Sequence, residues 1–114
     1  MLNGLAAECH QIAKDKGFWG APQDPARTLM LIVSEAAEAL EEVRAGREVD
    51  DYYFDKPDPG VKPAKPCGVP SEMADIIIRT LDACAAWGID IDLAVTEKMD
   101  YNRERGHMNG GKVF

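Results

Sequence analysis

The sequence predicts an all-α protein, a single helical domain that covers residues 1–114. Three observations favour this fold class. Apolar residues recur at intervals of three and four along four segments, which is the spacing of one face of a helix. Glycine, proline and aspartate stand at the ends of these segments, as is typical of helix termini. No segment alternates apolar and polar residues in the manner of a strand.

The first two predicted helices occupy the N-terminal part of the chain. One covers about residues 2–16 and ends before Gly17, a residue type favoured just after a helix. The next covers about residues 25–45. Asp24 precedes it as an N-cap acceptor, and proline is tolerated at its first position.

A long irregular loop is predicted at about residues 47–69, because proline and aspartate are dense there. Loops of this length are uncommon unless they are functional. A third helix begins near residues 70–72 and ends at Gly88, and Asp90 is placed to cap a fourth that runs to about Arg105. The short connector predicts that the third and fourth helices pack as an antiparallel hairpin.

A second copy of the chain is predicted to complete the helical bundle. A chain of 114 residues builds only a small core. Met30 and Leu31 add apolar surface beside the main apolar stripe of the second helix. We therefore expect a homodimer or a homotetramer.

Composition excludes several classes of protein. The formal charge of −7 opposes binding to a nucleic acid duplex or to an anionic membrane. No run approaches the roughly 20 apolar residues of a membrane span, and we expect a cytoplasmic protein. Cys9, Cys67 and Cys84 form no CxxC pair, which argues against a structural zinc site and a disulfide framework. His10 and His107 fit no Glu-x-x-His pattern, so a di-iron site is disfavoured and both are predicted to be surface residues.

Acidic residues lie beside an apolar stripe on the second and third predicted helices. The stripe of the second helix, predicted to face the core, comprises Leu29, Ile32, Val33, Ala36, Leu40 and Val43. Glu35 and Glu38 lie beside it, and Glu72 and Asp75 repeat the arrangement on the third helix. Carboxylates three residues apart share one helical face, and two such pairs on facing helices suit a hard cation such as Mg²⁺. The alternative is that both acidic faces are simply solvated.

Two stretches, LIVSEAAEALEEV and PSEMADIIIRTLD, resemble the MazG-like nucleotide pyrophosphohydrolases of the all-α NTP pyrophosphatase superfamily. Members carry an ExxE motif on one helix and ExxD on the next, which Glu35, Glu38, Glu72 and Asp75 match. The segments KGFWG and KMDYNRERGHMNGGK also resemble regions of such enzymes. The 33 residues between the motifs (39–71) are more than compact members are expected to have, and the extra residues fall in the loop.

The resemblance implies a four-helix bundle-like MazG fold, completed by homo-oligomerisation, and a Mg²⁺-dependent enzyme, with Mn²⁺ as a possible substitute. The implied reaction hydrolyses a nucleoside triphosphate (NTP or dNTP) to the monophosphate and pyrophosphate. The four carboxylates would be the metal ligands and catalytic residues. The implied substrate-binding residues are Lys98, Asn102, Arg103, Lys112 and Trp19. The metal would polarise the α-phosphoryl group and acidify the attacking water, so no nucleophilic side chain is required.

Each of these roles has a plainer alternative. Lys98 and Arg103 also suit the negative end of a helix dipole, and Phe18 and Trp19 also suit simple packing. Glu42 is a candidate auxiliary ligand, together with the less well placed Glu41, although a solvated role is favoured for both. For the whole chain, the alternative is a non-catalytic helical module that senses nucleotides or binds another protein.

Overall fold

The computed structural model describes residues 1–56 and 63–106, and the predicted all-α class is confirmed there. The helices are α1 (Leu2–Asp15), α2 (Pro25–Arg44), α3 (Val69–Ala86) and α4 (Ile91–Glu104). They correspond closely to the four predicted segments. Within the described ranges, none of them combines the length and apolar character that crossing a membrane requires.

The predicted helix caps are present. The Asp24 side chain accepts a hydrogen bond from the Ala26 N–H at 3.0 Å, and the Asp90 side chain accepts one from the Leu93 N–H at 3.1 Å. Each carboxylate thereby satisfies one of the backbone donors that a helix start leaves unpaired. The glycines that follow the ends of the first three helices have positive φ, and they are Gly17, Gly46 and Gly88.

The loop between α2 and α3 is not irregular throughout, so that part of the prediction is wrong. Strands β1 (Tyr53–Phe54) and β2 (Pro66–Cys67) pair in antiparallel fashion. Two-residue strands are too short to produce a visible alternation of apolar and polar residues. Gly68 fixes the base of this hairpin, because at its φ of 100° a Cβ atom would lie 2.1 Å from the Asp51 carbonyl oxygen.

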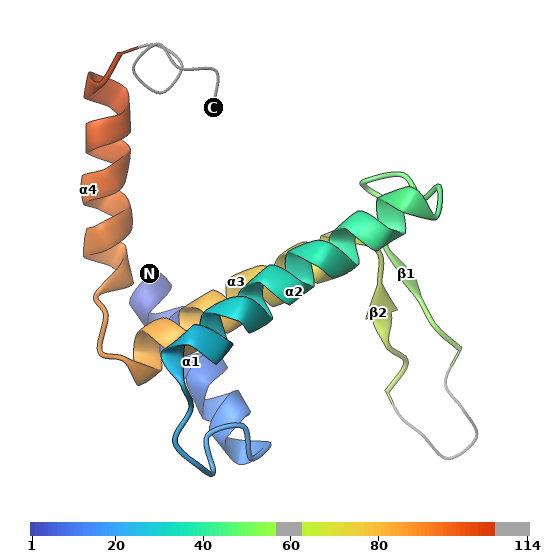
Figure 1. Cartoon of the computed structure of the whole chain (residues 1–114), viewed down its shortest axis with the longest axis horizontal. Coiled ribbons are helices and arrows are strands. Elements are labelled where there is room, and N and C mark those ends of the chain that lie inside the picture. Colours follow the sequence, from blue (N-terminus) through green and yellow to red (C-terminus); the bar gives the residue numbers. More distant parts are fainter. Residues whose placement is uncertain (57–62, 107–114) are drawn as a thin grey trace.

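The helices pack around α3, which lies against both α1 and α2 (Figure 1). In the figure α2 and α3 run antiparallel, while α4 stands apart from them and contacts α1 sparsely. The predicted α3–α4 hairpin is therefore wrong. The connector turns the chain away from α3, and no residue within the described helix α4 is buried. A short connector favours a hairpin only when the second helix has an apolar face to place on the first.

The core of the single chain is small. A cluster of Ala6, Cys9 and Leu81 joins α1 to α3. The apolar stripe of α2, which was predicted to face the core, is instead largely exposed, with Leu29 and Val33 each 53% accessible. That prediction is wrong for the single chain, because α2 turns its acidic face toward α3.

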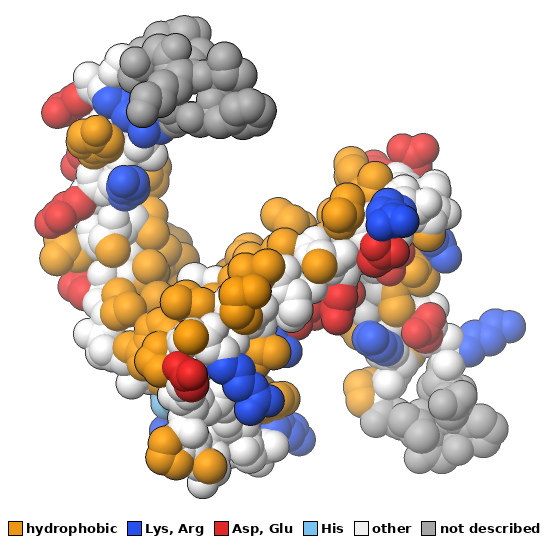
Figure 2. All heavy atoms as spheres, viewed as in Figure 1, with side chains coloured by type: hydrophobic (Ala, Val, Ile, Leu, Met, Phe, Trp, Pro, Cys, Tyr) orange, Lys and Arg blue, Asp and Glu red, His pale blue; other side chains and the backbone are white. Residues whose placement is uncertain are grey.

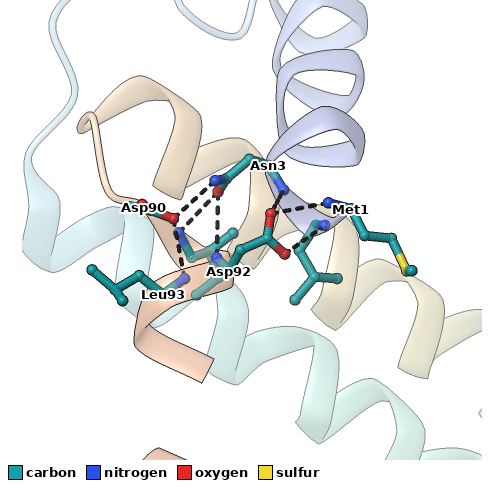
Figure 3. A network of polar contacts seen from close by, with 7 residues as sticks. Met1, Asn3, Asp90, Asp92 and Leu93 are labelled. Carbon is teal, nitrogen blue, oxygen red and sulfur yellow. Dashed lines mark hydrogen bonds and ion pairs between the residues drawn. The ribbon is translucent and has the colours of Figure 1, made fainter. Parts of the chain in front are cut away.

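The start of α4 is tied to the start of α1 by a network of polar contacts (Figure 3). The Asp92 carboxylate accepts hydrogen bonds from the backbone N–H groups of Leu2 at 2.8 Å and Asn3 at 3.0 Å, and from the amino group of Met1 at 3.1 Å. The Asn3 side chain in turn donates to Asp90 at 2.8 Å and accepts from the first backbone N–H groups of α4. Each helix therefore caps the other.

We expect Asn3→Ala to destabilise the junction between α1 and α4. The substitution removes the acceptor of the first α4 amides and the donor to Asp90, at a cost of about 1 kcal/mol in the free energy of unfolding. Chemical denaturation measures this cost, and hydrogen exchange should accelerate in the first turn of α4. Asn102→Ala, at an exposed position of the same helix, is the control. Equal effects of the two substitutions would show that the network does not hold α4.

Candidate functional site

Three of the four predicted carboxylates meet between α2 and α3. Ligand oxygens of Glu35, Glu38 and Glu72 all lie within 4.8 Å of one another. Glu35 and Glu38 share a face of α2 because they are three residues apart, and Glu72 comes from the first turn of α3. The prediction that the two acidic faces meet is thereby confirmed for these three residues.

Two of these carboxylates are buried, and one oxygen of each lacks a hydrogen-bond partner among the described residues. Glu35 is 6% accessible and Glu72 is 9% accessible, whereas Glu38 is exposed. Within the described residues, neither Glu35 Oε2 nor Glu72 Oε2 has a hydrogen-bond partner. Burying an unpaired carboxylate oxygen is costly, so such atoms require a proton or a cation. These two oxygens are the strongest sign of a ligand in the described structure.

The neighbours shift the pKa values of the two buried groups in opposite directions. Burial, together with the adjacent Glu38 and Glu35 carboxylates, raises the pKa of Glu72 to about 7. Burial also raises the pKa of Glu35, but the hydrogen bond from Arg79, the adjacent Glu72 carboxyl and the Arg79 charge outweigh burial and leave that pKa below its ordinary value. Glu72 is therefore the group that holds a proton near neutral pH.

Arg79 is a member of the site that the sequence analysis did not select. Its Nε donates to Glu35 Oε1 at 2.6 Å. The side chain of Arg79 is 34% accessible, so it stands at the edge of the site rather than inside the helix pair. Arg79 lies four residues after Asp75 on α3, which places it on the same helical face as the acidic residues. This spacing is the feature of the sequence that could have identified it.

Asp75 lies beside the group of three. It lines the same cavity as Glu35 and Arg79, and it is only partly buried. Burial raises its pKa, the Glu35 charge adds to that effect, and the Arg79 charge opposes it. Asp75 therefore lies within electrostatic reach of the group, although the three close oxygens belong to the glutamates.

A cavity of about 250 Å³ opens beside these carboxylates. It is bounded by α1, the α1–α2 connector, α2 and α3, and its walls include Ile12, Phe18, Trp19, Gln23, Thr28, Leu31, Glu35, Asp75, Ile78, Arg79 and Asp82. Leu31, an apolar residue outside the main apolar stripe of α2, forms part of this wall. The mixture of apolar walls with a few convergent polar groups is typical of a small-molecule site.

The Trp19 wall of the cavity is held by Asp82, a partly buried aspartate. The Trp19 Nε1 donates to the Asp82 carboxylate at 2.9 Å and 3.1 Å, and His10 Nδ1 lies 2.7 Å from Asp82 Oδ1. The His10 and Trp19 rings meet edge to face with centroids 5.4 Å apart. The prediction that His10 is a surface residue is wrong, because its side chain is 20% accessible and fixed by Asp82. His10 and Asp82 are 72 residues apart, so no spacing in the sequence indicated their contact.

The predicted substrate contacts of α4 are not brought to the carboxylates in the single chain. Lys98, Asn102 and Arg103 lie on exposed positions of α4, which does not pack along α2 or α3. The Lys98 ammonium lies over the Tyr101 ring, and Arg103 pairs with Asp100. Lys112 and His107 lie outside the described residues.

Glu42 has a structural partner instead of a place in the site. The Tyr53 hydroxyl donates to both Glu42 oxygens at 3.0 Å, and the Arg47 guanidinium stacks on the Tyr53 ring at 3.8 Å. These contacts attach the β-hairpin to the end of α2. Glu41 pairs with Arg44 at the surface.

The donor set fits a hard divalent cation. All candidate ligands are carboxylate oxygens, which Mg²⁺ and Mn²⁺ prefer. The four acidic groups carry four negative charges when ionised, and Arg79 offsets one of them, which leaves a net charge of −3. A proton on Glu72 reduces the charge to −2. A divalent cation that displaced this proton would meet a charge of −3 and leave a net charge of −1.

Comparison with protein-family models, with curated proteins and with solved structures finds no match to this chain.

We expect the metal-free protein to lose stability as the pH rises from about 5 to 8. The folded state holds the Glu72 proton up to a pKa of about 7, whereas the unfolded chain releases it near 4.5. Folding therefore binds a proton in this window, and each unit of pKa difference corresponds to about 1.4 kcal/mol. Thermal unfolding of Glu72→Gln should show a smaller decline than the wild type. Glu41→Gln, at a surface carboxylate, should behave as the wild type does.

Added Mg²⁺ should raise the unfolding temperature of the wild type at pH 8, because the cation takes the place of the lost proton. The same addition should have little effect on Glu72→Gln. A wild-type stability that is constant over this pH range would contradict the assignment of a shared proton to Glu72.

Proposed function

We propose that the chain is a Mg²⁺-dependent nucleoside triphosphate pyrophosphohydrolase that converts an NTP or dNTP to the monophosphate and pyrophosphate. The observation that carries the proposal is the pair of buried, unpartnered oxygens of Glu35 and Glu72 inside a group of three carboxylates. The resemblance of the ExxE and ExxD motifs to MazG-like enzymes supports the same reaction, with Mn²⁺ as a substitute metal.

The proposed chemistry needs charge and position rather than a nucleophilic side chain. A divalent cation, when bound, would polarise the α-phosphoryl group and make water a better nucleophile. Glu35, Glu38, Glu72 and Asp75 would hold it. Ionisation of Glu72, which stays protonated up to about pH 7 without metal, would supply the full ligand charge.

Arg79 is the cation that we propose for the phosphate groups in the single chain. Its hydrogen bond to Glu35 uses Nε and leaves the two terminal nitrogens of the guanidinium to donate to a planar pair of oxygens. Lys98, Asn102, Arg103 and Lys112 remain predicted substrate contacts.

The cavity beside the carboxylates is proposed to receive the nucleoside. Trp19 offers it an aromatic wall whose orientation is fixed by Asp82, and Leu31 and Ile78 offer apolar contacts. A fixed ring loses little freedom when a base packs against it, which favours binding. The same proposal includes a cytoplasmic enzyme that acts as a homodimer or a homotetramer.

Pyrophosphate release from a panel of canonical and modified NTPs and dNTPs, with Mg²⁺ or Mn²⁺, tests the proposed reaction. We expect Glu38→Gln to reduce kcat by about a hundredfold or more, since it removes a ligand from the group of three. Glu41→Gln, three residues further along α2 and outside the group, should retain full activity.

Two results would contradict the proposal. Activity on no nucleotide would exclude the enzyme, and activity unaffected by Glu38→Gln would exclude this site. Calorimetry then distinguishes the remaining hypotheses about function. Binding of Mg²⁺ and nucleotide without turnover would indicate a nucleotide-sensing module, and no binding would indicate a protein-interaction module.

For Arg79 we expect Arg79→Lys to lower kcat/KM by roughly tenfold to a hundredfold, because an ammonium keeps the charge but cannot form the planar pair of hydrogen bonds. Steady-state kinetics on the best nucleotide of the panel measures this change. Arg44→Lys, which exchanges the same residue types at an exposed ion pair of α2, is the matched control. A kcat/KM for Arg79→Lys equal to that of the control would remove Arg79 from the substrate site.

A further inference from the structure

The cavity beside the carboxylates has a second polar end, about two helical turns away from the acidic group. Along α3 its walls include Asp75 and Asp82, and along α2 they include Glu35 and Thr28. The members of each pair are seven positions apart, which is about 10 Å along a helix axis. Because α2 and α3 run antiparallel (Figure 1), Glu35 and Asp75 lie toward one end of the cavity and Thr28 and Asp82 toward the other. Trp19 belongs to the second end, since it donates to Asp82.

The Asp82 carboxylate has hydrogen-bond acceptor capacity that its protein partners do not use. Its Oδ1 lies 2.7 Å from His10 Nδ1 and accepts from Trp19 Nε1 at 2.9 Å. Among the described residues, Oδ2 receives only the longer branch of the Trp19 hydrogen bond, at 3.1 Å. An ionised carboxylate offers about four lone-pair sites, so Oδ2 can still accept from a ligand. The Asp82 side chain is only 16% accessible although it lines the cavity, so a ligand in the cavity would meet this charge with little competing water.

The hydroxyl of Thr28 adds a second acceptor at the same end of the cavity. Thr28 is 7% accessible, and its Oγ1 donates its single proton toward Gln23 Oε1 at 3.5 Å or the Asp24 carbonyl oxygen at 3.4 Å. A hydroxyl that has committed its proton can only accept from a ligand. Together with the Asp82 charge, this end of the cavity favours N–H donors and disfavours carbonyl oxygens.

We propose that Asp82 determines the base specificity of the nucleotide site and selects cytosine or adenine. These bases carry an amino group where uracil, thymine and hypoxanthine carry a carbonyl oxygen. The amino N–H donates to Asp82 Oδ2 while the ring packs against Trp19, which the same carboxylate holds in place. A carbonyl oxygen at that position is repelled by the carboxylate and leaves it without the added donor. This inference rests on the proposed function and adds the class of base to it.

Matched nucleotides test the proposal, because the ratio of two kcat/KM values cancels a general loss of activity. The pairs are dCTP with dUTP and dATP with dITP, and the deciding pair is that of the ring size hydrolysed faster. We expect the wild type to favour the amino nucleotide by about tenfold to a hundredfold, as for the loss of one hydrogen bond to a charged group.

Asp82→Asn should lower this ratio to about one or reverse it. The amide oxygen can still accept from Trp19, whereas the amide N–H donates to a carbonyl oxygen of the base. Asp50→Asn makes the same exchange at an exposed residue outside the cavity walls, and it should keep the wild-type ratio. A merely structural role of Asp82 would lower both kcat/KM values together and leave their ratio unchanged.

Calorimetry with the corresponding monophosphates needs neither a variant nor turnover, and it covers the case in which Asp82→Asn fails to fold. The wild type should bind dCMP more tightly than dUMP, or dAMP more tightly than dIMP, by about tenfold or more.

Two outcomes would overturn the inference and leave the proposed reaction in place. One is hydrolysis in which the wild type does not prefer the amino nucleotide, and the other is a preference that persists unchanged in folded Asp82→Asn. A chain that neither hydrolyses nor binds any nucleotide would instead remove the proposed function, and the base specificity of Asp82 with it.

Discussion

The burial of carboxylates between α2 and α3 is the constraint on which the rest of the site depends. Two glutamates that are each less than 10% accessible face one another from adjacent helices, where mutual repulsion and desolvation both oppose folding. An ordinary helix pair would place leucine there. The structure offsets part of the cost with the Arg79 guanidinium on Glu35 and part with a proton on Glu72. In the proposed function, a bound cation would offset the remainder.

This arrangement makes the charge balance of the site depend on pH and on metal. Arg79 favours the ionised form of Glu35, and burial together with the neighbouring carboxylates keeps the Glu72 proton in place up to about pH 7. A cation that displaces this proton gains a further ionised ligand, so affinity for metal should increase as the pH rises toward and past 7. The same interactions therefore connect stability without metal to ligand binding with it. That link does not depend on turnover and would hold for a sensor as well as for an enzyme.

Local chemistry made the helices and half of the site predictable, whereas the relative placement of elements was not. Asp24 and Asp90 cap the helices that they were predicted to cap, because a cap needs only residues within one turn. The spacing of Glu35 and Glu38 likewise fixed their common face. The prediction of which face of α2 packs inside the chain was wrong, because amphipathic spacing identifies an apolar face but does not show whether the rest of the chain covers it. The contact of His10 with Asp82 spans 72 residues and has no signature in sequence spacing.

The exposed apolar side chains of α2 and α3 (Figure 2) and the separation of α4 from them both reflect which surfaces of the helices pack in the single chain. An acidic interior between α2 and α3 leaves their apolar stripes outside, and α1 covers the C-terminal half of α3 through Ala6, Cys9 and Leu81. Helix α4, tied to α1 only near its first turn, carries its basic residues away from the carboxylates. In a single chain, Arg79 is then the cation beside the acidic group. Because the carboxylates occupy the contact between α2 and α3, apolar side chains of both helices, such as Val33 and Ile77, remain exposed in the single chain.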